Sequence, residues 1–493
     1  MRSRTAVAAI VSASTLALAP APATPQAPAR PPEPIVREIQ LVALFDRNGD
    51  KRLDVAERGA AKAYLAAHPE LRPPRRASRL TAGSPGPKVT PADVKAFPGR
   101  PLYDPGVLRT LFVEFDDPAW EKELAEFHGT DVEVPATLVV DGRTYPGVGV
   151  HFRGHNSFLA VPEGRKRPLT VAIDLVDESQ RLLDYRGLHL LNAYQDPTFL
   201  RGLLYLEIAR DYIPAPRANL VEIVINNESW GVYVNQQRFD SDFLRGHYKT
   251  TKGTRWRALN NAPGGGLSYL GEHLDPYKEA YEIKSKDTPK AWTALRDLCR
   301  VLHETPPDRL ERALAPIFDI EGALEWLALD NVLMNGDGYW EDGSDYNLYL
   351  NEQGRFSLVP YDVNEAFRPL GGRRGGPAAG ATLDPFAMAD DPKKALLGKL
   401  LAVPAFRSRY LRHIRTIADR ELDWTALGPR VARYEALISQ AVARDTRKLY
   451  STEEFHAGLG TAAGNGAPVT TIKGFAQQRR TFLLSHPEIA RVK

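Results

Sequence analysis

Short runs rich in apolar and β-branched residues, bounded by turn residues, follow residue 102, and such runs are typical of β-strands. They cover residues 136–140, a following run that ends at 152, and residues 169–175, 220–225 and 231–234. Asp141-Gly142 and Asn226-Asn227 separate neighbouring stretches, and both pairs favour the tight turns of antiparallel hairpins. The pattern predicts an antiparallel sheet with one helix, residues 198–212, inserted into it.

Helical spacing of apolar residues dominates after residue 285. Residues 292–302 and 322–334 are predicted helices, and a single strong hairpin interrupts the helical region. Its strands are residues 347–350 and 355–359, joined through residues 351–354. The large domain is therefore predicted to be α+β, with an antiparallel-sheet N-terminal part and a mainly helical C-terminal part.

Composition changes along the chain predict its domain organisation. A basic start and a short apolar stretch indicate a secretory signal peptide at residues 1–23, so we expect a secreted protein; a disordered leader on a cytosolic protein is the alternative. Residues 24–34 and 72–101 are Pro-rich and are interpreted as linkers. They flank a small helical module at residues 35–71, and the large domain occupies residues 102–493. No later segment is apolar enough for a transmembrane anchor.

Charge and cysteine content exclude several classes of protein. The 493 residues carry a net charge of only +3, so the charge does not indicate that the protein binds nucleic acid. Cys299 is the single cysteine, so neither an intramolecular disulfide nor a cysteine-rich metal site can form. The sequence also lacks the phosphate-binding GxxxxGK[ST], the HExxH zinc motif and the GxSxG nucleophile motif.

A twelve-residue loop in the small module has the ligand spacing of an EF-hand. Oxygen-bearing side chains stand at positions 1, 3, 5, 9 and 12 of this loop, as Asp46, Asn48, Asp50, Asp54 and Glu57. Ca²⁺ takes six or more oxygen ligands, and the last acidic residue can supply two. Lys51 occupies position 6, where glycine normally permits the sharp turn. The loop predicts one Ca²⁺ site, and a solvated acidic helix cap is the alternative.

The segment from 328 to 367 carries the candidate catalytic groups. A helix leads into a polar loop with Asp337, Asp342 and Asp345, and the hairpin begins at Asn347. Folding the hairpin about residue 353 places Asn347 opposite residue 359, so that Asn347 and Asp362 emerge at the same end. Carboxylates and an amide oxygen that converge in this way suit Mg²⁺ together with phosphate oxygens. Protein kinases arrange a catalytic Asp, an Asn, a short hairpin and a metal-binding Asp in the same order.

Several short motifs follow one another along the large domain, namely GVHFRGHNS from 149, LNAYQDP from 191, PAP from 214, WGVY from 230, NGDG from 335 and PYD from 360. Through these motifs the chain resembles the CotH family of spore coat protein H-like atypical secreted kinases from about residue 102 to 493. The resemblance implies an atypical protein-kinase-like fold, ATP and Mg²⁺ or Mn²⁺ as cofactors, and phosphate transfer to Ser or Thr of a protein. It assigns catalysis to Asp337 and metal binding to Asn347 and Asp362, while the spacing of Asp342 to Asn347 leaves Asp342 as the alternative catalytic residue.

Two departures from the family pattern concern phosphate binding. Thr170 stands where many members carry a Lys, and Gln237 stands where many carry a Glu. Arg153 or Lys166 would then have to contact the nucleotide phosphates. The sequence as a whole predicts a secreted, metal- and ATP-dependent protein kinase that acts on an exported or surface protein. A catalytically silent surface or adhesion protein and a kinase-fold transferase of another group are the alternatives.

Overall fold

The computed structural model describes residues 37–72, 78, 80–259, 262–336, 338–371, 378–462 and 467–492. The predicted signal peptide, the linker at residues 24–34 and Asp337 lie outside these ranges. The described part mixes sheets and helices, which confirms the predicted α+β class.

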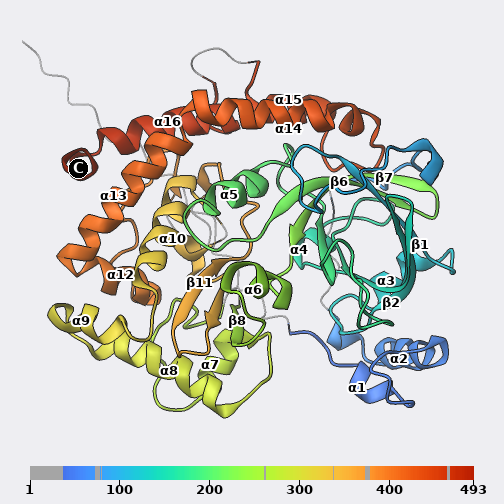
Figure 1. Cartoon of the computed structure of the whole chain (residues 1–493), viewed down its shortest axis with the longest axis horizontal. Helices are drawn as coiled ribbons and strands as arrows, with labels where there is room; N and C mark the ends of the chain where they lie inside the picture. Colours follow the sequence, from blue (N-terminus) through green and yellow to red (C-terminus); the bar gives the residue numbers. More distant parts are fainter. Residues whose placement is uncertain are drawn as a thin grey trace, which may run out of the picture. The chain divides into compact units, whose positions relative to one another are not determined.

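A closed barrel of seven strands forms the first half of the large domain (Figure 1). Its strands are β1 (Arg109–Glu114), β2 (Val134–Val140), β3 (Arg143–Phe152), β4 (Leu169–Ala172), β5 (Gly187–Leu191), β6 (Ala218–Ile225) and β7 (Glu228–Gln237). They follow one another around the barrel in the order β1-β2-β3-β4-β5-β7-β6. Every pair is antiparallel except β1 and β6, which close the barrel in parallel.

Two turns of the barrel adopt the backbone conformation that their sequences favour. Asp141 and Gly142 both have positive φ angles, 52° and 77°, between β2 and β3. Asn226 and Asn227 have φ angles of 47° and 61° between β6 and β7. Positive φ at both central residues matches the right-handed twist of the flanking strands. Both predicted hairpins are therefore confirmed.

A second, four-stranded antiparallel sheet has the order β11-β10-β8-β9. Its strands are β8 (Thr254–Ala258), β9 (Tyr281–Ile283), β10 (Tyr346–Leu350) and β11 (Phe356–Pro360). Asn347 pairs with Val359 across the β10–β11 hairpin, which is the predicted register. The short strands β8 and β9 were not predicted from the sequence. A separate two-stranded ladder joins β12 (Leu370–Gly371) and β13 (Ala378–Ala379).

Helices connect the strands and make up most of the C-terminal half. Those before residue 320 are α1 (Val42–Phe45), α2 (Val55–Ala67), α3 (Trp120–Glu126), α4 (Asn156–Leu159), α5 (Arg201–Ala209), α6 (Ser241–Tyr248), α7 (Asp275–Ala280), α8 (Pro289–Glu304) and α9 (Pro307–Leu314). The later ones are α10 (Ile320–Leu333), α11 (Tyr339–Asp342), α12 (Ala395–Leu401), α13 (Pro404–Glu421), α14 (Trp424–Arg444), α15 (Thr452–Leu459), α16 (Ile472–Ser485) and α17 (Pro487–Arg491). Helix α14 packs against β7 and α16, so the C-terminal helices contact the barrel directly. None of the helices in the described ranges combines the length and apolar content needed to cross a membrane.

The small N-terminal module packs on the barrel. Leu41, Leu53 and Leu65 belong to the same hydrophobic cluster as the barrel interior. Arg58 on α2 forms a buried ion pair with Glu123 on α3, with Nε and Oε1 3.2 Å apart. Because apolar burial and a buried ion pair join the two parts, we expect them to unfold together.

Candidate functional site

Asn347 and Asp362 lie at the same end of the β10–β11 hairpin. Asn347 is buried, and its side-chain Nδ2 donates to the carbonyl oxygen of Pro360 at 3.5 Å. This contact orients the amide beside the chain segment that leads to Asp362, which is half-buried. The hairpin therefore brings together the two groups that the sequence predicted as metal ligands.

Two arginines from different sheets meet beside Asp362. Arg153 follows β3 of the barrel, and its Nη2 donates to the phenolic oxygen of Tyr361 at 3.2 Å. Arg257 on β8 donates to the same oxygen from Nη1 at 2.9 Å. In the β8–β10 register Arg257 stands opposite Asn347. Arg153, predicted as a phosphate ligand, thus lies at the hairpin end that carries the predicted metal ligands.

The two arginines affect the pKa values of Tyr361 and Asp362, the two residues that follow the hairpin. Burial raises the pKa of Asp362, and the charge of Arg153 offsets this effect only in part. Burial also raises the pKa of Tyr361, but the charges of Arg257 and Arg153 outweigh it and hold the phenol pKa below its ordinary value. Since a bound cation favours an ionised carboxylate, a metal at Asp362 would lower the pKa of that residue.

The loop that carries the NGDG motif is attached to the same segment. Asn335 donates from Nδ2 to the carbonyl oxygen of Asp362 at 3.1 Å, and Phe367 donates its backbone N–H to Leu333. A Cβ atom at Gly338 would lie 2.5 Å from Nδ2 of Asn335, so a larger residue there would displace this amide. The first of these contacts places Asn335 beside Asp362. Asp337 lies outside the described residues.

Asp330 on α10 contacts this loop, since its carbonyl oxygen accepts the backbone N–H of Asn335 at 3.2 Å. Its Oδ1 accepts a hydrogen bond from the hydroxyl of Tyr205 at 2.6 Å, and its carboxyl group is buried. Burial raises the pKa of Asp330 to about 7, so the folded state favours the protonated carboxyl group.

Stability should consequently depend on pH through Asp330. Its contribution is complete below the unfolded-state pKa of about 4 and is lost as pH rises through the folded-state pKa. We expect this group to lower the free energy of unfolding by up to about 1.4 kcal/mol per pH unit across that window. Asp330→Asn, which keeps an acceptor for Tyr205, should remove this dependence in urea denaturation series. An unchanged pH slope in the variant would contradict the prediction.

Lys166 does not join the predicted site. Its side chain is completely buried, and its Nζ contacts Oδ2 of Asp445 at 2.6 Å and the carbonyl oxygen of Val232 at 2.9 Å. Burial lowers the pKa of Lys166, and the Asp445 charge counteracts this effect. Both hydrogen bonds of this ammonium group join the barrel to Asp445, the residue that follows α14. We therefore assign Lys166 a structural role and retain only Arg153 as a predicted phosphate ligand.

Sequence reasoning missed the charged residues of β8 and β9. Glu282 on β9 holds Arg257 through Oε2 and Nη2, 2.7 Å apart, and accepts from Lys284 at 2.8 Å. The alternation Thr-Arg-Trp-Arg-Ala in β8 is a strand signal that could have indicated outward-facing arginines. Their partners could not be predicted, because β9 and β10 are distant from β8 along the chain.

The calcium-type loop is closed by its own hydrogen bonds. Asp46 accepts backbone N–H groups from Gly49 at 2.7 Å and Lys51 at 2.8 Å. Lys51 has a φ of 64°, so the left-handed turn usually made by glycine forms here with lysine. Glu57 accepts N–H groups from Arg47 and Asp54. In the part of the chain that is described, no three His, Cys, Asp or Glu side chains are grouped closely enough to hold a metal. The oxygen donors and the turn nevertheless fit Ca²⁺ chemistry, and the site stays a prediction.

Ca²⁺ is expected to raise the temperature of the main unfolding transition. At about a hundredfold excess over the dissociation constant, one bound ion would stabilise the fold by about 2.7 kcal/mol. Glu57→Gln should abolish most of this effect, whereas Glu70→Gln, which lies beyond the end of α2, should not. Calorimetry that detects no Ca²⁺ uptake by the wild-type protein would refute the site.

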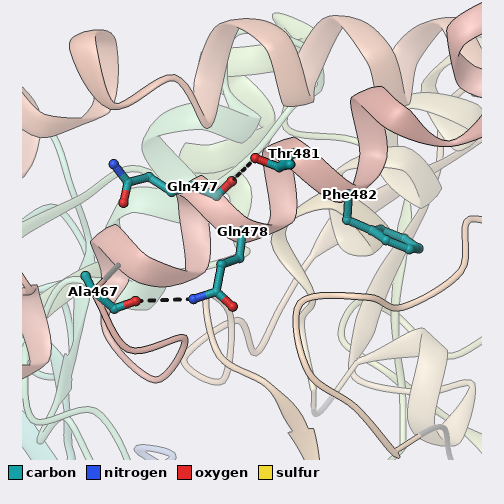
Figure 2. Close-up of a pocket in the computed structure, with 5 residues that line it drawn as sticks. All are labelled: Ala467, Gln477, Gln478, Thr481 and Phe482. Atoms are coloured by element: carbon teal, nitrogen blue, oxygen red, sulfur yellow. Dashed lines mark hydrogen bonds between the residues drawn. The ribbon is translucent and has the colours of Figure 1, made fainter. Parts of the chain in front are cut away.

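A shallow hollow lies along α16, away from the charged residues described above. Figure 2 shows the described residues that line it, which are Ala467, Gln477, Gln478, Thr481 and Phe482. The side chain of Gln478 donates to the carbonyl oxygen of Ala467 at 3.2 Å, and the hydroxyl of Thr481 donates to the backbone carbonyl oxygen of Gln477 at 2.8 Å. The hollow has a volume of about 340 Å³, and none of its described lining residues carries a titratable group. Its chemistry does not support catalysis, so the candidate site remains at the hairpin end.

These features define a class of α+β proteins in which a closed barrel and a second antiparallel sheet bring charged residues together at one hairpin end. Residues 150–483 match the family model described as CotH kinase protein. The match covers more than half of the chain, and the protein belongs to the CotH family. The resemblance found in its motifs is thereby confirmed.

Two curated relatives are each 24% identical to the chain over part of its length. The inner spore coat protein H-like protein of Bacillus subtilis is 24% identical over 270 residues, which cover 54% of this chain and 72% of the relative. The spore coat protein homolog 1 of Rhizopus delemar is 24% identical over 280 residues, covering 53% of this chain and 43% of the relative.

Proposed function

We propose that this protein is an atypical protein kinase that transfers the γ-phosphoryl group of ATP to Ser or Thr of an exported or surface protein. The observation that carries the proposal is the convergence of Arg153, Asn347 and Asp362, which come from different elements. A cation, an amide and a carboxylate at one place suit a metal-bound nucleotide. The name of the matching family model supports the same activity.

Each group has a separate role in the proposed reaction. Asp362 and the amide oxygen of Asn347 would hold Mg²⁺ or Mn²⁺, which supplies charge neutralisation at the phosphates. Arg153 would donate hydrogen bonds to phosphate oxygens. Asp337 would orient the acceptor hydroxyl and take its proton while the hydroxyl oxygen bonds to the γ-phosphorus and ADP leaves. The kinase-like fold and the Ca²⁺ module belong to the same proposal.

Mass spectrometry tests this proposal directly. The purified protein is incubated with ATP and Mn²⁺, alone and with a generic protein acceptor, and intact masses and modified residues are determined. We expect phosphate on Ser or Thr with the wild-type protein and none with Asp362→Ala. A different mass increment would instead indicate a kinase-fold transferase of another group.

A silent surface protein is the second candidate, because both relatives are named as spore coat proteins. It predicts a folded protein that binds no metal–nucleotide complex and modifies no acceptor. Nucleotide binding that requires Mn²⁺ would exclude this candidate even before an acceptor is found.

A further inference from the structure

Arg257 is a charged residue next to the candidate metal site, and a ligand can reach it. It stands on β8 opposite Asn347, and adjacent strands lie about 4.8 Å apart. Its side chain is 27% exposed. The guanidinium is fixed on two sides, since Nη2 contacts Oε2 of Glu282 at 2.7 Å and Nη1 contacts the phenolic oxygen of Tyr361 at 2.9 Å.

Arg153 approaches the same phenolic oxygen from the barrel, 3.2 Å away. Two guanidinium groups from two different sheets therefore share one acceptor. Each guanidinium has five N–H donors, and the contacts named above use one donor of Arg153 and two donors of Arg257. The remaining donors can form charge-assisted hydrogen bonds with phosphate oxygens, for which planar guanidinium groups are well suited.

We propose that Arg257 is a second phosphate-contacting residue and forms with Arg153 a clamp for adjacent phosphates of a nucleoside di- or triphosphate. Glu282 and Tyr361 are the positioning residues of this clamp. The inference rests on the proposed function, since it adds a residue to the same nucleotide site. It also predicts a specificity: a monophosphate can engage one arginine fully, whereas a chain of two or more phosphates engages both.

The positions of Glu282 and Tyr361 support their positioning roles. Glu282 binds both Arg257 and Lys284, so its carboxylate fixes the arginine from the side away from Tyr361. Tyr361 is in turn held by Gln236 on β7, whose Nε2 donates to its carbonyl oxygen at 3.2 Å. The clamp thus depends on β3 and β7 of the barrel and on β8, β9 and β11 of the second sheet.

Calorimetric titration with ADP, AMP and inorganic tripolyphosphate in the presence of EDTA tests the clamp without the metal. The wild-type protein should bind ADP and tripolyphosphate more tightly than AMP. Arg257→Gln should weaken binding of ADP and tripolyphosphate by about tenfold or more, which is the loss expected for a hydrogen bond to a charged group. Arg257→Lys keeps the positive charge but loses the paired N–H donors of the guanidinium. Its affinity for ADP and tripolyphosphate should lie between those of the wild-type protein and Arg257→Gln.

The positioning residues are tested by selectivity. Glu282→Gln and Tyr361→Phe should reduce the preference for ADP over AMP while the unfolding temperature stays near that of the wild-type protein. Arg255→Gln is the matched control, because Arg255 lies on the same strand but donates to the carbonyl oxygen of Phe239. It should leave the preference unchanged.

The inference is overturned if Arg257→Gln binds tripolyphosphate and ADP like the wild-type protein, or if the wild-type protein does not prefer them to AMP. Phosphoryl transfer to a protein acceptor is measured separately for each variant. If the wild-type protein transfers phosphate and Arg257→Gln binds nucleotide and transfers phosphate equally well, the clamp is rejected and the kinase proposal stands. A functional clamp without any transfer would reject the kinase and keep the anion site.

Discussion

Asp362→Ala is expected to lose metal-dependent nucleotide binding and phosphoryl transfer together, with turnover falling by several orders of magnitude. The carboxylate would be the metal ligand at the hairpin end, and phosphoryl transfer depends on the ion to neutralise developing charge. Folding should persist, because the side chain is half-buried and lies outside the apolar core. Single-turnover kinetics and Mn²⁺ titrations measure the two losses.

Asp390→Ala provides the control for Asp362→Ala, since Asp390 is exposed and outside the site. Full activity in Asp362→Ala would refute the kinase proposal. Asp337→Ala should behave differently, retaining metal–nucleotide binding while turnover falls, because its role arises mainly in the transition state. If Asp342→Ala loses turnover while Asp337→Ala does not, Asp342 is the catalytic residue.

Lys166→Ala is expected to lower the free energy of unfolding by about 3–5 kcal/mol. Removing the lysine leaves the carboxylate of Asp445 buried without its charged partner, and this is costly in a low-dielectric interior. A Cβ atom at Gly231 would lie 2.0 Å from Oδ2 of Asp445, so the carboxylate packs directly against the backbone of β7. Urea denaturation gives the change in free energy.

The double variant Lys166→Met with Asp445→Asn is the informative comparison. It removes both charges and should recover part of the stability that the single variant loses. A phosphate ligand at Lys166 would produce the opposite pattern, with weaker nucleotide binding and nearly unchanged stability. That result would contradict the structural role assigned to the residue.

Local sequence patterns determined most of the barrel strands, their tight turns and the β10–β11 hairpin. Short runs rich in apolar and β-branched residues located most barrel strands, and Asp141-Gly142 and Asn226-Asn227 specified their turns because their backbones tolerate positive φ angles. The β10–β11 hairpin was also predicted with its register, since the turn and the strand period fix which residues face each other. The placement of Asn347 beside the segment of Asp362 followed from this local geometry.

Tertiary structure decided which charged residues serve the candidate site and which serve the fold. Arg153 and Lys166 are only 13 positions apart and were equivalent as cations in the sequence. The barrel directs Arg153 to Tyr361, whereas Lys166 is buried against Asp445, which is 279 positions away. Arg257 meets Glu282 and Tyr361 only because β8 pairs with both β9 and β10. Such contacts depend on how segments that are distant along the chain pack together, and the short-range pattern of apolar residues carries no information about this packing.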